Sequence, residues 1–186
     1  LVILAQEADL PLPTIVSRCQ HVPLRPLPVQ VVERALIERW DAGAQQAALL
    51  AHLSGGRPGW AVRNLEDEEV LARRAERLDT LNRLVRASII ERFDYAEKLS
   101  RDPVATQETL DLWIGWWRDV MLMAAGADAP LTNVDHQEDL RYQARHVDVA
   151  TIATVIRALR SALQKLQRNA NRRLTLEVLM LDLPCM

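Results

Sequence analysis

The sequence predicts a mainly all-α protein, and three observations carry this prediction. Apolar residues recur at steps of three or four through most of the chain after Pro28, which places them on one face of a helix. The 6 glycines and 9 prolines are few and mostly clustered, so they mark the ends of helices. Residue types that cap helices precede several of the apolar stretches.

Residues 1–28 differ from the rest of the chain. The apolar run from Leu1 to Ala5 predicts a short buried strand. The prolines that follow forbid a continuous helix, so we expect one helical turn around residues 12–19 and then an extended connector. Because the sequence opens on a strand and lacks a starting methionine, we expect it to be part of a longer protein.

Three short helices are predicted next. Val29, Val32, Leu36 and Trp40 fall on one helical face. Residues 44–53 are rich in alanine and leucine and are followed by two glycines, a common helix end. A third helix is predicted to begin at Pro58, because proline is accepted in the first turn.

The charged residues 66–77 mark a predicted boundary between two helical parts. We expect them to begin a long connecting helix whose charges face water. Further helices are predicted over residues 149–168, with a near-heptad apolar stripe, and over residues 174–183.

Helix starts are marked by specific capping patterns. Ser88 with Glu91, and Asp135 with Glu138, have the residue types and spacing of capping boxes. Asp102 precedes a proline at the first helical position, which predicts another start.

One predicted helix carries three tryptophans. Leu110, Trp113 and Trp117 share one face, while Trp116 points about 100° away. A helix that is apolar on two faces lies either in the centre of a bundle or at a subunit interface, and we favour the bundle centre. We expect a buried set in this bundle: Leu110, Trp113, Trp117, Ile152, Ile156, Leu159 and Leu163.

Composition narrows the class of protein. The 23 Lys and Arg residues against 25 Asp and Glu give a net charge of −2, which argues against a surface devoted to nucleic acid or membrane. We expect no membrane association, since Leu1–Ala5 is too short to span a bilayer. Cys19 and Cys185 form no disulfide framework and suit a reducing cytoplasm.

The sequence carries no recognisable catalytic or metal-binding pattern. The four histidines lack ligand spacing, and there is neither a phosphate-binding loop nor a nucleophile elbow. We therefore expect no cofactor, no metal site and no ATP hydrolysis by this chain.

One short string, residues 12–20, places Arg18 between Ser17 and Cys19 in a constrained segment after the predicted strand. The planar, permanently charged fork of an arginine held in this way suits phosphate recognition. From the residues alone, an ordinary surface arginine remains the alternative interpretation.

The string Pro-Thr-Ile-Val-Ser-Arg-Cys-Gln resembles the signature of clamp-loader ATPase subunits of the AAA+ family. The resemblance continues in order along the chain. Residues 53–62 resemble the sensor-2 segment of the helical lid, and residues 169–177 resemble the Asn-x-Asn-x-x-Leu-x-Leu-Glu end of the delta-prime collar. The similarity implies three parts: residues 1–23 from an AAA+ α/β domain, residues 24–69 as a helical lid, and residues 70–186 as a helical-bundle collar.

The resemblance also implies a function. The protein would be a non-hydrolysing subunit of bacterial DNA polymerase III that helps load the sliding clamp onto primed DNA. Its collar would contact other clamp-loader subunits, gamma/tau and delta, while clamp and primed DNA would be reached indirectly. Arg18 would be an arginine finger acting in trans, with Ser17 and Cys19 as its motif neighbours.

Two alternatives stay open at this point. Gly59 stands where the ATP-hydrolysing tau/gamma type has the sensor-2 arginine, which favours the delta-prime type, although Arg57 lies two residues earlier. The other alternative is an unrelated helical protein-interaction module in which the Ser-Arg-Cys string is accidental.

Overall fold

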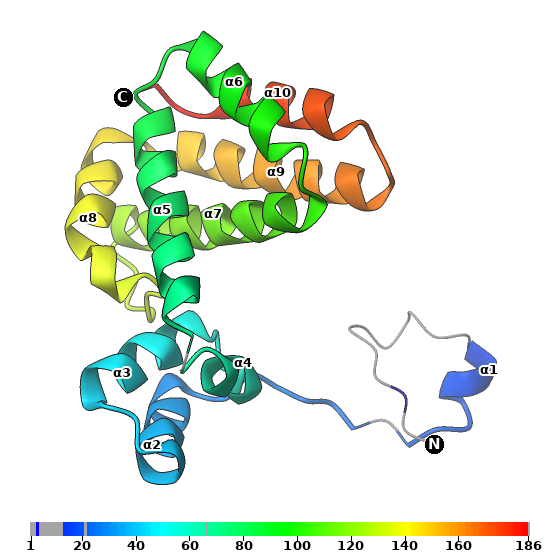
Figure 1. Ribbon diagram of the computed structural model, residues 1–186, viewed down its shortest axis with the longest axis vertical. Coiled ribbons are helices and arrows are strands. Elements are labelled where there is room, and N and C mark those ends of the chain that lie inside the picture. Colours follow the sequence, from blue (N-terminus) through cyan, green and yellow to red (C-terminus); the bar gives the residue numbers. More distant parts are fainter. Residues whose placement is uncertain (1–2, 4–12, 21, 66, 186) are drawn as a thin grey trace.

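The computed structural model describes residues 3, 13–20, 22–65 and 67–185, and these residues are mainly helical (Figure 1). No strand occurs among them. The strand predicted over residues 1–5 lies outside the described residues except for Ile3. The helices are α1 (Pro13–Val16), α2 (Val29–Trp40), α3 (Ala44–Leu53), α4 (Pro58–Arg63), α5 (Glu68–Leu84), α6 (Ile89–Leu99), α7 (Pro103–Ala124), the 3-10 helix η1 (Val134–His136), α8 (Gln137–His146), α9 (Val149–Gln167) and α10 (Arg172–Asp182).

Helices α2, α3 and α4 pack around a small apolar core. Val32 and Leu36 of α2 meet Ala47, Leu50 and Ala51 of α3, and all five are buried. The alanines let the helices approach closely. The prediction for this segment is confirmed: α3 spans residues 44–53 and α4 begins at Pro58.

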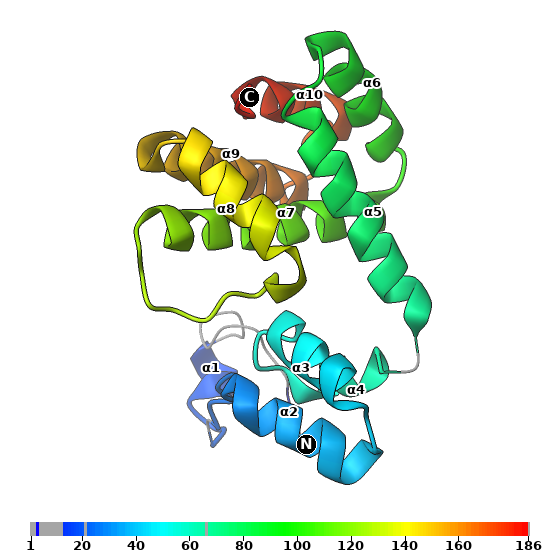
Figure 2. The same ribbon diagram turned by 90° about the vertical axis from the view of Figure 1, so that its left-hand side faces the viewer.

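Helices α5 to α10 enclose a second, larger core. Helix α7 lies at its centre, packed against α5, α8 and α9, while α10 packs on α6 and α9 (Figures 1 and 2). Trp113, Trp116 and Trp117 are fully buried, so the interpretation of this helix as the bundle centre is confirmed. Of the expected buried set, Ile156 and Leu163 are only partly buried against this core, because they lie nearer the outer face of α9.

Capping residues begin several helices of the larger bundle. The Ser88 Oγ accepts from the Glu91 amide at 3.4 Å, and the Glu91 carboxylate accepts from the Ser88 amide at 2.9 Å, which completes the predicted capping box. Asp102 accepts from two amides at the start of α7, with Pro103 in the first turn.

The second predicted capping box is wrong. Asp135 lies inside η1, and α8 begins after His136 without a side-chain cap. The Asp135 carboxylate instead accepts hydrogen bonds from Nη1 and Nη2 of Arg74 at 2.6 and 3.0 Å. A charge-assisted bidentate pair is stronger than a cap, so the carboxylate is drawn away from the helix start.

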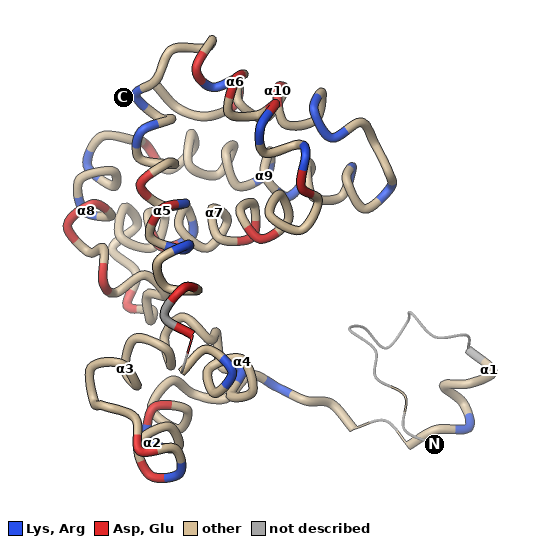
Figure 3. Tube along the Cα trace, viewed as in Figure 1, with Lys and Arg blue, Asp and Glu red and all other residues tan. Residues whose placement is uncertain are grey.

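Helix α5 runs from the small helices into the larger bundle, as predicted for a connecting helix (Figure 2). Charged residues of both signs lie along α5 (Figure 3), but not all of them are solvated. Arg73 pairs with Glu69 at 3.1 Å on the surface, but Arg74 is only 9% exposed and turns into the bundle. No helix among the described residues is long and apolar enough to cross a membrane.

Candidate functional site

Ser17, Arg18 and Cys19 form a turn directly after α1. The amides of Arg18 and Cys19 donate to carbonyls three residues earlier at 3.0 and 3.1 Å, and Ser17 Oγ donates to the Thr14 carbonyl at 3.2 Å. All three side chains are exposed. Local hydrogen bonds thus hold the backbone while the Arg18 guanidinium lies at the surface.

An exposed connector, residues 22–28, joins this turn to α2 and is anchored at its far end. The Leu27 amide donates to the Gly56 carbonyl at 2.9 Å. Gly56 has a φ of 80°, and a Cβ there would lie 2.5 Å from the Leu27 carbonyl oxygen. Any larger residue at position 56 would therefore push the connector away from the turn between α3 and α4.

The segment predicted to resemble sensor 2 lies at the start of α4. Arg57 precedes the helix, and its Nε donates to the Ser54 carbonyl at 2.8 Å. Burial raises the pKa of Asp111 on α7, and the nearby positive charge of Arg57 opposes that rise. Gly59 is exposed, and a Cβ added to it meets nothing within 4 Å. Packing therefore does not require glycine at position 59.

A buried polar cluster links α5, α7 and the loop before η1. Asp119 is fully buried, and its Oδ2 accepts from the amides of Thr132 and Asn133 at 2.9 and 2.8 Å and from Asn133 Nδ2 at 2.8 Å. Arg74 donates to Asn133 Oδ1 at 2.6 Å. The carboxylate satisfies otherwise unpaired backbone amides, so it fixes the path of the loop.

The same loop touches the small helices. His52 Nδ1 of α3 lies 2.7 Å from the Leu131 carbonyl oxygen, and Figure 2 shows the loop beside α3. The loop is therefore a joint between the two apolar cores. The sequence analysis did not predict this joint; the charged pair Arg118 and Asp119 between apolar residues of one helix was the available signal.

The residues at the end of the chain that resemble the collar signature build a tight turn. Asn169 adopts a left-handed φ of 59° after α9. The Asn171 side chain accepts from the Leu174 amide at 3.0 Å and caps α10. Both asparagines suit these places because asparagine tolerates positive φ and is a strong N-cap.

The described part of the chain contains neither a cluster of metal-ligating residues nor a pair of bonded cysteines. It contains no group of three or more histidine, cysteine, aspartate or glutamate residues that could hold a metal ion. Cys19 and Cys185 are both free and exposed.

Comparison with known proteins decides the family. Residues 68–184 match the family described as "DNA polymerase III, delta subunit, C terminal". The chain belongs to this family. It is also similar to DNA polymerase III subunit delta' of Bacillus subtilis (strain 168), with 25% identity over 192 residues that cover 98% of this chain and 56% of the relative. The predicted resemblance to the delta-prime type is confirmed, and the chain spans just over half the length of that relative.

The match to the DNA polymerase III delta C-terminal family covers α5 to α10, the whole larger bundle. It includes the joint at Asp119 and the turn at residues 169–171. The three small helices and the turn at Arg18 precede the matched residues, so the role of Arg18 is argued separately below.

Proposed function

We propose that this chain is the helical C-terminal part of a non-hydrolysing clamp-loader subunit that helps place the sliding clamp on primed DNA in the bacterial cytoplasm. Its three parts are the end of an AAA+ domain to residue 23, a lid over residues 24–69 and a collar over residues 70–186. Membership of the DNA polymerase III delta family and the similarity to a delta' subunit support this proposal. The two separate apolar cores agree with a lid distinct from a collar.

Arg18 is proposed to act in trans on a neighbouring subunit's ATP. The observation that carries this role is an exposed guanidinium on a turn fixed by its own hydrogen bonds. Figure 1 shows α1 apart from both helical groups, at the end of the connector. An arginine presented in this way is free to meet a surface of another subunit. Its fork matches two phosphate oxygens at once.

The space around Gly59 supports a non-hydrolysing subunit over the tau/gamma type. Glycine offers no charge to a nucleotide, and this exposed position has room for the Cβ of a larger residue. Arg57 lies two residues earlier, before the first residue of α4, so its side chain leaves the backbone in a different direction from position 59. A glycine that packing does not require at this position supports the proposal that this chain makes no sensor-2 contact with a nucleotide.

An apolar stripe on α10 is the surface we propose for assembly with the gamma/tau and delta subunits. Leu174, Val178 and Leu181 share one helical face and are 60%, 44% and 61% exposed. Contiguous exposed apolar side chains of this kind mark protein–protein contacts. The sliding clamp and primed DNA are reached indirectly, through the assembled complex.

Replacement of Arg18 in the full-length protein tests the proposal. We expect Arg18→Ala to enter the reconstituted complex normally, while DNA- and clamp-stimulated ATP hydrolysis falls about 10³-fold or more at the one neighbouring site. Arg18→Lys should restore little, because a point charge does not reproduce the bidentate fork.

Arg25→Ala is the matched control, since Arg25 is also exposed and lies in the connector. It should leave hydrolysis unchanged. Normal turnover in the Arg18→Ala complex, with assembly verified by gel filtration, would reduce the turn to a structural feature.

A further inference from the structure

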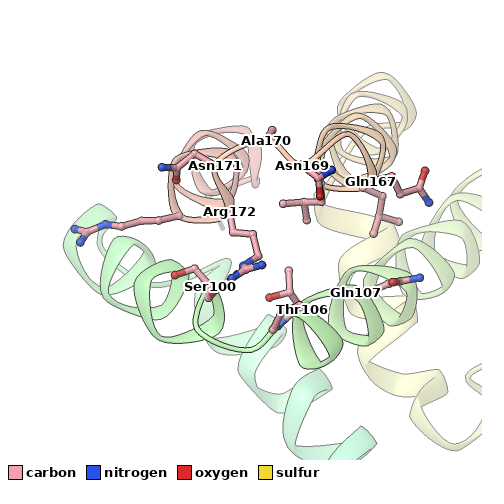
Figure 4. A pocket seen from close by; sticks show the side chains of 12 residues that line it. Ser100, Thr106, Gln107, Gln167, Asn169, Ala170, Asn171 and Arg172 are labelled. Carbon is pink, nitrogen blue, oxygen red and sulfur yellow. Dashed lines mark hydrogen bonds between the residues drawn. The ribbon is translucent and has the colours of Figure 1, made fainter.

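A groove of about 680 Å³ lies between the start of α7 and the turn that joins α9 to α10 (Figure 4). Its volume is within the range of small-ligand and peptide sites. Leu163, Leu166 and Pro103 supply apolar surface, and the amide side chains of Gln107 and Gln167 also line it. The groove therefore combines an apolar surface with groups that form hydrogen bonds.

Arg172 is held in place across one side of the groove. Its Nε donates to the Ser100 carbonyl at 3.0 Å, and Figure 4 shows the side chain reaching from the turn toward Ser100. This bond uses one of the five guanidinium N–H groups. The two terminal NH₂ groups make no hydrogen bond or ion pair with the described residues and remain available at a fixed position.

The surroundings of the groove are positively charged. No aspartate or glutamate lines it. Two cations, Arg172 and Arg173, are among its lining residues. Arg173 is paired with Glu97 at 3.3 Å and with Glu177 at 2.7 Å, so Arg172 supplies the positive charge that has no carboxylate partner among the described residues. The field in the groove therefore favours an anion.

We propose that this groove binds an acidic peptide segment of a partner polypeptide, with a carboxylate on Arg172 and an apolar side chain on Leu163 and Leu166. Arginine forks match carboxylates bidentately, and a groove with apolar walls and amide side chains suits a peptide. Single-stranded nucleic acid sites stack bases on aromatic rings, and no aromatic residue lines this groove. The inference goes beyond the proposed clamp-loader function and does not depend on Arg18.

The test selects peptides on the immobilised 186-residue chain from a displayed library of random octapeptides. We expect the selected peptides to carry Asp or Glu next to Leu, Ile or Phe. Synthetic versions, measured by fluorescence anisotropy, should bind Arg172→Ala about tenfold more weakly, because a charge-assisted hydrogen bond is lost.

A charge series at Gln107 separates binding from folding. Gln107 is exposed on the α7 side of the groove, so Gln107→Glu should weaken binding and Gln107→Lys should strengthen it, both with an unchanged denaturation midpoint. Gln164→Glu is the matched control, since Gln164 is exposed on α9 but does not line the groove. It should change binding less than twofold.

Three results would overturn the proposal. One is a selection without an acidic–apolar consensus. Another is equal weakening by Gln107→Glu and Gln164→Glu, which would indicate unspecific charge attraction. The third is a fifteen-nucleotide oligo-dT that binds with the same dependence on Arg172 and Gln107, which would make the ligand a nucleic acid.

Discussion

Removal of the Arg92 side chain on α6 is predicted to destabilise the larger bundle as strongly as removal of a large core side chain. Arg92 is only 2% exposed and donates hydrogen bonds to backbone carbonyls at the ends of two helices. The last carbonyls of a helix lack partners within the helix and carry the negative end of its dipole. At the end of α5 the acceptors are Leu84 at 2.8 Å and Val85 at 3.3 Å. At the end of α10 they are Met180, in its last turn, at 3.1 Å, and Leu183 and Pro184, which follow it, at 2.9 and 3.0 Å.

The size of the effect follows from these bonds. A hydrogen bond to a charged group contributes ~1.5–3 kcal/mol, and the contributions do not add fully because the remaining groups relax. We therefore expect Arg92→Ala to lower the free energy of unfolding by about 3–5 kcal/mol, similar to the loss of one partner from a buried ion pair. Arg92→Lys should recover only part, since its three N–H groups lie on one nitrogen.

Urea denaturation of the 186-residue chain, followed by tryptophan fluorescence, measures this loss. Arg101→Ala is the matched control, because Arg101 lies on the surface and pairs only with Glu97 at 3.1 Å. Its effect should be ~0–1 kcal/mol. An Arg92→Ala variant within 1 kcal/mol of the parent chain would refute the view that this guanidinium ties α5 and α10 together.

Two further predictions concern the core and pH. Trp113→Ala should lower the free energy of unfolding by about 3–5 kcal/mol, since Trp113 is fully buried. Trp40→Ala, at a 43% exposed position, should lower it far less. An unchanged denaturation midpoint for Trp113→Ala would contradict the core assignment. Hydrogen bonds from Thr151 hold the pKa of Asp148 below its ordinary value. Its contribution is therefore present at neutral pH and is lost as pH falls through the lowered pKa. The difference in midpoint between the parent chain and Asp148→Ala should shrink below pH 4 (about the ordinary carboxylate value), while Asp128→Ala at an exposed position should show no such trend.

Local patterns allowed much of the fold to be predicted. The Asp102 cap, the start of α4 at Pro58 and the end of α3 at residue 53 depend on neighbours within a few positions, which the sequence displays directly. The burial of Trp113 followed from helical periodicity combined with its apolar neighbours. Such features need no knowledge of tertiary partners.

The sequence-based prediction failed where a side chain binds a partner far away in the sequence. Asp135 has the spacing of a capping box, but Arg74 lies 61 residues earlier in the sequence and competes for its carboxylate. In the same way, Arg92 meets carbonyls up to 92 residues away, and nothing near it in the sequence indicates this. At the candidate site, the exposed turn holding Arg18 was predictable from local residues and resemblance. The anchoring of its connector on Gly56 was not, because it joins Leu27 to a turn between two later helices.

Nearly all positively charged side chains of this chain are arginines. Only two of the 23 Lys and Arg residues are lysines, Lys98 and Lys165, so 21 are arginines. Arg57 and Arg172 each use Nε to bond a backbone carbonyl, and Arg92 uses all three guanidinium nitrogens. Lysine carries its three N–H groups on one nitrogen, so it cannot present the planar, two-pronged set of donors that a guanidinium offers. Arginine therefore serves here as a connector between segments as well as a charge, and the same geometry leaves the terminal NH₂ groups of Arg172 for the carboxylate proposed as its partner.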